Sequence, residues 1–100
     1  MALDHIMTQE LEKIIDKTIE QIPKMAMWLS SKNIDWHMLE ITNESDFMKG
    51  AIVSQIVNQF AAFLVLGYKR ELTAADASDI QKIVLTRADD IKNGIKAIGI

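Results

Sequence analysis

Residues that break helices are scarce in this 100-residue chain, and their scarcity limits the folds that it can adopt. Proline occurs once, at Pro23, and glycine occurs four times, always alone. Turns and hairpins usually need clusters of such residues. Long helices are therefore the default. No repeat, low-complexity tract or linker divides the chain, so we expect one helical domain over residues 1–100.

The first expected long helix covers residues 8–22. Its apolar side chains recur at the three- and four-residue spacing of one helix face, and its other face is rich in charges. Thr8 is a candidate N-cap, because its hydroxyl can accept a hydrogen bond from a free backbone N–H. Pro23 then either kinks this helix or occupies the first turn of a new one. We favour a break, followed by a short helix over 24–31.

Residues 30–44 give the weakest pattern. Ser30, Ser31 and Asn33 favour a turn. The residues that follow fit either a short helix over 36–41 or a strand fragment. A single strand would have no partner in this chain, so we expect the short helix.

Residues 45–69 form the most apolar element. Asn43 and Asp46 have the spacing of a capping box, and Ser45 is the other candidate cap. The first half of this helix carries a polar strip, whereas the stretch 60–66 is apolar on every side. A helix of this kind is buried in a core, in a partner or in lipid.

The last expected long helix covers residues 73–98, with Thr73 and Asp76 as a capping pair. Apolar residues recur every seven positions and form a stripe that faces the core. The stripe consists of Ala77, Val84, Ile91 and Ile98, with Ile80, Ala88 and Ile95 alongside. Three long helices with short connections, plus one or two short helices, predict a small all-α bundle.

Composition excludes several classes of function. Cysteine is absent, which rules out disulfides, thiolate metal sites and cysteine nucleophiles. The net charge is −3 with mixed signs, so the clustered positive surface that nucleic-acid binding needs is missing. The first residues include acids and no basic stretch. We therefore expect no secretory signal, and a cytoplasmic location.

A membrane span is the alternative reading of residues 50–68. These nineteen residues carry no formal charge, and nineteen is about the length that crosses a bilayer. Four polar side chains lie within the stretch, and each is costly in hydrocarbon without a partner. They are Ser54, Gln55, Asn58 and Gln59. We therefore expect a buried helix of a soluble bundle, with no role for a membrane.

No residues match a catalytic or metal-binding pattern. Of the two histidines, only His37 has an acid, Glu40, three residues away. Di-iron bundles use the reverse order, twice, with further glutamates. The isolated glycines form no phosphate-binding loop, and no serine has the context of a nucleophile. We predict no enzyme, no cofactor and no metal ion.

Methionine and tryptophan are concentrated around the irregular segment. Methionine fills irregular spaces, and tryptophan is common at interface hot spots. These residues either close the end of the bundle or line a groove for a partner helix or an apolar ligand. They are Met25, Met27, Trp28, Trp36 and Met38, with Phe47 and Met48 nearby.

The stretch 60–66 gives the leading hypothesis about function. Two neighbouring helices leave part of its surface uncovered, so we expect a homodimer or binding to a protein partner. The alternative is a bundle that binds a small apolar ligand or a lipid. Asn58 is a candidate for an amide that sets the register of an interface. The candidate interface or pocket residues are Phe60, Phe63, Leu64, Leu66, Trp28, Trp36, Met38 and Asn58.

Overall fold

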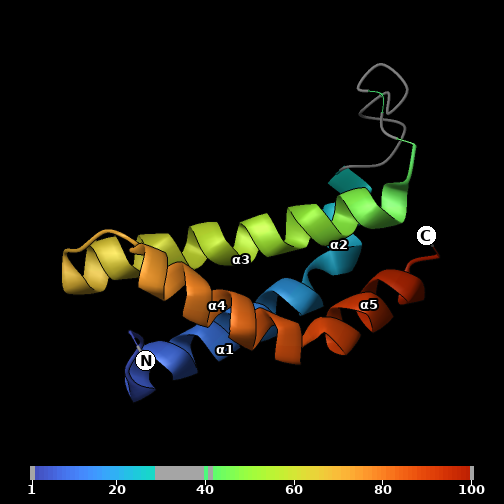
Figure 1. The fold of residues 1–100 in the computed structure, drawn as a ribbon. Coiled ribbons are helices and arrows are strands. Elements are labelled where there is room, and N and C mark those ends of the chain that lie inside the picture. Colours follow the sequence, from blue (N-terminus) through green and yellow to red (C-terminus); the bar gives the residue numbers. More distant parts are fainter. Residues whose placement is uncertain (1, 29–39, 41, 100) are drawn as a thin grey trace.

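The computed structural model describes residues 2–28, 40 and 42–99. This part of the chain contains five helices and no strand (Figure 1). The helices are α1 (His5–Glu20), α2 (Ile22–Trp28), α3 (Glu44–Tyr68), α4 (Ala74–Thr86) and α5 (Ala88–Ala97). The predicted small all-α bundle is confirmed.

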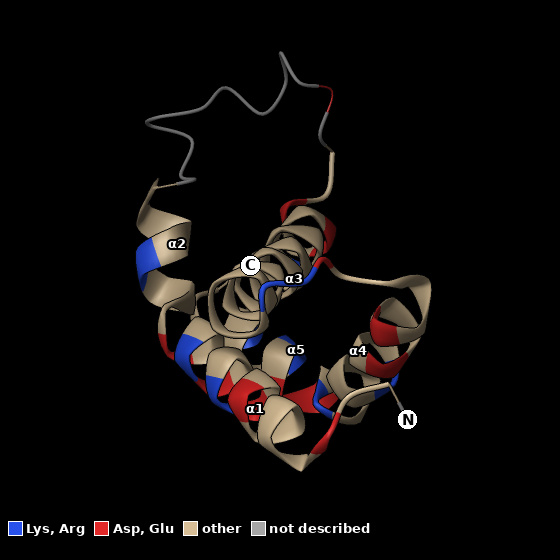
Figure 2. Ribbon diagram, turned by 90° about the vertical axis from the view of Figure 1, so that its left-hand side faces the viewer, with Lys and Arg blue, Asp and Glu red and all other residues tan. Residues whose placement is uncertain are grey.

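The long helix α3 runs along one side of the bundle, and α1, α4 and α5 lie on the other side (Figures 1 and 2). α1 makes the most extensive contact with α3, and α5 packs against both. The buried residues of α3 are four positions apart, and this spacing places them on one face of the helix. They are Met48, Ile52, Ile56, Phe60 and Leu64. The core therefore lies in the angle between α3 and the other helices.

α1 begins three residues before the predicted helix. Asp4 is its N-cap, because the Asp4 carboxylate accepts a hydrogen bond from the Met7 backbone N–H at 2.8 Å. The prediction that Thr8 caps this helix is wrong: Thr8 lies in the first turn, and its hydroxyl donates to the Asp4 carbonyl at 2.9 Å. Leu3 precedes the cap and is buried in the core. The residues before the helix are thus part of the fold.

The predicted break near Pro23 is confirmed. Gln21 is the C-cap of α1, and α2 starts at Ile22, so Pro23 occupies the first turn of α2. Proline is tolerated there because a first-turn N–H has no partner within its own helix. The end of the predicted helix over 24–31 lies outside the described residues. So does the predicted helix over 36–41, apart from Glu40.

The prediction of one continuous helix over 73–98 is wrong, because α4 and α5 meet at a break at Arg87. The Thr86 hydroxyl donates to the Ile83 carbonyl at 2.6 Å, and the Arg87 backbone leaves the helical range with φ −105° and ψ 10°. The break redirects α5, so that its apolar residues Ile91 and Ile95 are buried in the core.

The Arg87 side chain holds this break against α1. Its guanidinium contacts Glu12 at 2.6 Å and Asp16 at 2.5 Å on α1, and Asp90 at 2.8 Å on α5. Both α1 acids lie more than 70 residues away in the sequence. The break thus coincides with a tertiary contact, which the local seven-residue spacing does not indicate.

The other two caps are as predicted. The Asn43 side chain accepts a hydrogen bond from the Asp46 N–H at 3.0 Å and caps α3. Thr73 and Asp76 form a capping box at the start of α4, in which each side chain accepts from the backbone N–H of the other. Both boundaries follow from local hydrogen bonding, which is why short sequence patterns identify them.

Candidate interaction surface

The structure divides the predicted stretch 60–66 between the core and the surface. Phe60 and Leu64 are fully buried within this chain, and Phe63 is half-buried beside them. Leu66 lies on another side of α3 and is 82% exposed. Phe60 and Leu64 therefore belong to the chain's own core, and the expected contact with a partner stays a prediction for the exposed side of this stretch. Phe60 and Leu64 are four positions apart, so they share the helix face that packs into the chain's own core.

The remaining predicted residues lie apart from that stretch. Asn58 is exposed on the outer side of α3. Trp28 is exposed at the end of α2, where it lines an open hollow of about 380 Å³ together with Gln21, Lys24 and Met25. The predicted Met/Trp residues Trp36 and Met38 lie outside the described residues.

A shallow apolar groove between α3 and α4 is the most coherent surface feature of the described chain. It encloses about 250 Å³. Leu85 lines it and is 64% exposed, and Val53 is also exposed. The full lining is Val53, Val57, Ala77, Ile80, Gln81, Val84 and Leu85. The lining contains no charge, and Gln81 is its one polar residue.

The groove exists because α4 diverges from α3. α4 starts near the C-terminal end of α3 and then runs away from it toward α1 and α5 (Figure 1). On the α3 side, Val53, Val57, Ala61 and Val65 are four positions apart and form a ridge beside the core-facing residues. We call these four residues the outer ridge. Val53 and Val57 of the outer ridge form one wall of the groove.

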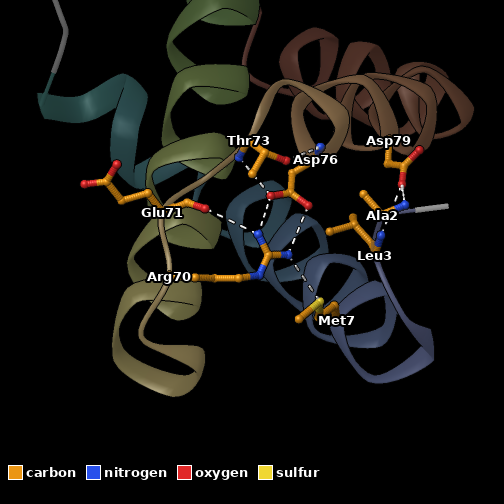
Figure 3. A network of polar contacts seen from close by, with 8 residues as sticks. All are labelled: Ala2, Leu3, Met7, Arg70, Glu71, Thr73, Asp76 and Asp79. Atoms are coloured by element: carbon orange, nitrogen blue, oxygen red, sulfur yellow. Dashed lines mark hydrogen bonds and ion pairs between the residues drawn. The ribbon is translucent and has the colours of Figure 1, made fainter.

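A polar network fixes the start of α4 and thereby the position of the groove (Figure 3). Asp76 is 1% exposed and accepts two hydrogen bonds from Arg70, Nη1 to Oδ2 at 2.5 Å and Nη2 to Oδ1 at 3.0 Å. These bonds from the Arg70 guanidinium hold the pKa of the Asp76 carboxyl well below its usual range, although burial acts in the opposite direction. Arg70 also approaches the Met7 Sδ at 3.8 Å. The network joins the α3–α4 connection to α1.

Asp79 ties the N-terminal residues to the same helix. Its Oδ2 accepts hydrogen bonds from the backbone N–H groups of Ala2 at 2.7 Å and Leu3 at 3.2 Å (Figure 3). Asp79 is itself buried, so these two donors satisfy a carboxylate that water does not reach freely. α4 is thus anchored at Asp76 and Asp79, neither of which lines the groove.

The sequence does not indicate the groove, because periodicity leaves open whether the apolar stripe of 77–98 packs within the chain or between chains. Ile80 and Val84 are buried, but Ala77 is exposed and lines the groove. The residue that could have indicated the groove is Leu85, a large apolar residue that lies outside the seven-residue stripe. Arg70 and Asp79 were also missed, since no local pattern links them to their partners.

The described residues show no arrangement that could hold a metal ion. No group of three His, Cys, Asp or Glu side chains converges within residues 2–28, 40 and 42–99. The His5 ring contacts the Gln9 amide at 3.1 Å on the exposed side of α1. His37 lies outside the described ranges.

α3 also meets the length and composition of a membrane span, with a mean hydropathy of 1.6 over its most apolar part. Core helices of soluble proteins meet the same criteria, so this observation carries little weight by itself. Only 22% of that part is buried within the chain, which means that much of α3 remains uncovered by the described helices.

The groove between α3 and α4 is the candidate interaction surface of the described chain. Its lining is uncharged, and hydrogen bonds to Asp76 and Asp79 anchor α4, which forms one of its walls. The chain matches no protein-family model, no curated protein and no solved structure.

Proposed function

We propose that this chain is a non-catalytic, cytoplasmic interaction module that pairs with a second copy of itself through α3 and α4. The observation that carries the proposal is the apolar groove between these helices. Its lining has one polar residue, Gln81, and no charge. Burial of apolar surface is the main favourable term in protein association. Pairing would remove Leu85 and Val53 from water.

The size of the groove supports a protein partner over a small ligand. Pockets for small molecules usually enclose about 300–1,000 Å³. This groove encloses about 250 Å³. A shallow apolar groove of this size suits a row of side chains from another helix, as in helix-in-groove recognition.

The test is the mass in solution, measured by size-exclusion chromatography with light scattering over a concentration series in detergent-free buffer. A dimer that dissociates on dilution would support the proposal. A monomer at every concentration would overturn it. In that case, the next measurement is whether Trp28 fluorescence responds to apolar ligands, because Trp28 lines the hollow beside α2.

A matched pair of variants links the dimer to the groove. Leu85→Glu places a charge in the groove at an exposed position, so we expect it to fold normally and to lower the dimer fraction. Ala75→Glu makes the same change of charge at another exposed position of α4, outside the groove lining, and should leave the dimer intact. Equal effects of both variants would contradict a role for the groove.

A further inference from the structure

We infer that Asn93 is a site of covalent modification, at which the side-chain amide is lost when the end of α5 detaches from the bundle. Asn93 is exposed in α5, and it is the one asparagine of the chain that glycine follows. Asparagine is a thermolabile residue. Its reactivity is greatest before glycine, because glycine has no side chain to shield its backbone nitrogen. The reaction does not depend on the proposed self-association.

The modification is a cyclisation followed by hydrolysis. The Gly94 backbone nitrogen attacks the Asn93 Cγ, the new C–N bond closes a cyclic imide, and the side-chain nitrogen leaves as ammonia with the proton from Gly94. Water then opens the imide at either carbonyl carbon. The products are aspartate and isoaspartate, in which the main chain runs through the side-chain carbons. One water is consumed and one ammonia is released, so no oxidant or reductant is needed.

Packing requires the glycine that makes Asn93 reactive. α5 closely approaches the junction of α1 and α2 at Gly94. A Cβ on residue 94 would lie 2.7 Å from the Ile22 Cδ1 and 3.6 Å from the Ile19 Cγ2. The first distance is shorter than real Cβ contacts, and Ile22 is fully buried, so it cannot move aside freely. The close approach of α5 therefore keeps a reactive pair of residues in the chain.

The helix blocks the reaction while α5 is docked. Gly94 lies within α5, where the backbone N–H is engaged by the carbonyl four residues earlier. α5 has 10 residues, and helices shorter than about 12–15 residues are marginal without tertiary packing. Its buried residues are Ile91 and Ile95. Local opening of α5, without unfolding of the whole chain, is therefore the step that permits cyclisation.

The new carboxylate would enter acidic surroundings. Asn93 lines an open hollow between α1 and α5, whose charged residues are Asp16, Glu20, Arg87 and Asp90. Arg87 already contacts Asp16 at 2.5 Å and Asp90 at 2.8 Å. A further negative charge in this hollow is therefore exposed to repulsion by the acids. We expect the modification to weaken the docking of α5.

Peptide mapping by mass spectrometry tests the site. The folded chain is incubated in warm, mildly alkaline buffer without denaturant, and aspartate and isoaspartate are measured at each asparagine. Asn58 is the internal control, because it is exposed within α3 and is followed by glutamine. We expect the products to appear at Asn93 before Asn58. Equal rates at the two positions would overturn the inference.

A matched pair of core variants tests the role of α5. Ile95→Val on α5 and Ile80→Val on α4 each remove one methyl group from a buried isoleucine. Ile95→Val should speed the reaction at Asn93 about 2- to 10-fold, because lost packing favours the detached helix. Ile80→Val should have a smaller effect. Equal acceleration, or none, would overturn local opening as the controlling step.

Asn93→Asp imitates one product and tests its effect on the fold. Asn58→Asp is the matched control, because it adds the same charge to α3, where residues 50–68 carry no charge. Asn93→Asp should lower the urea midpoint more than Asn58→Asp does, and added salt should narrow this difference by screening the repulsion. Equal midpoints at low salt would overturn the expected weakening of α5.

Discussion

Replacement of Arg70 by leucine should destabilise the fold strongly. The variant removes two hydrogen bonds from the buried Asp76 carboxylate and leaves the Thr73 backbone N–H at 2.9 Å as its remaining donor from the network. Loss of one partner from a buried ion pair costs about 3–5 kcal/mol. The Arg70 side chain is 32% exposed, so part of the pair is already in water. We therefore expect a loss of about 3 kcal/mol in the free energy of unfolding.

Urea denaturation at pH 7 would measure this loss, with Lys49→Ala as the matched control. Lys49 forms an ion pair with Asp46 at the surface of α3, and exposed pairs of this kind contribute about 0.2–1 kcal/mol. A loss below about 1 kcal/mol for Arg70→Leu, close to that of the control, would refute the argument that burial makes the Arg70–Asp76 pair important.

The pH dependence of stability gives a second readout. The pKa of Asp76 is lowered in the folded state, so its contribution is fully present above the ordinary aspartate pKa of about 3.9. The contribution is lost as the pH falls below that value toward the folded-state pKa. The native chain should therefore lose stability in acid more steeply than Arg70→Leu. Parallel pH curves would contradict the assignment.

Three other substitutions test the packing and the anchoring of α4. Gly50→Ala should raise the free energy of unfolding by about 0.5–1 kcal/mol, because an added Cβ meets no atom within 4 Å and alanine favours the helix. Gly94→Ala should lower the free energy of unfolding, because the added Cβ would lie 2.7 Å from the Cδ1 of the fully buried Ile22. Urea denaturation of the two glycine variants measures both effects. Asp79→Ala should cost about 1–3 kcal/mol and speed hydrogen exchange at Leu3, and unchanged exchange would contradict the anchor.

The sequence predicts features of this fold that depend on local interactions. The break before Pro23 and the caps at Asn43 and Thr73 each involve residues within four positions of one another. Short stretches of sequence determine these features, and the structure contains them.

Features that depend on distant residues could not be predicted in this way. Arg87, at the break, contacts acids on α1, and Asp79 accepts hydrogen bonds from the backbone of residues 2–3. The candidate groove between α3 and α4 also depends on residues that are distant in the sequence. Whether Ala77 and Leu85 are covered depends on the angle between α3 and α4, which no periodicity in α4 specifies.

The Arg87 contacts predict that the bend between α4 and α5 weakens in an isolated peptide of residues 73–98, and NMR of that peptide would test this. In a peptide that lacks α1, Glu12 and Asp16 are missing, and nothing on another helix draws the guanidinium aside. The uninterrupted seven-residue apolar stripe would then favour one straight helix. The shape of residues 73–98 in the folded chain would then depend on acids that lie more than 70 residues away in the sequence.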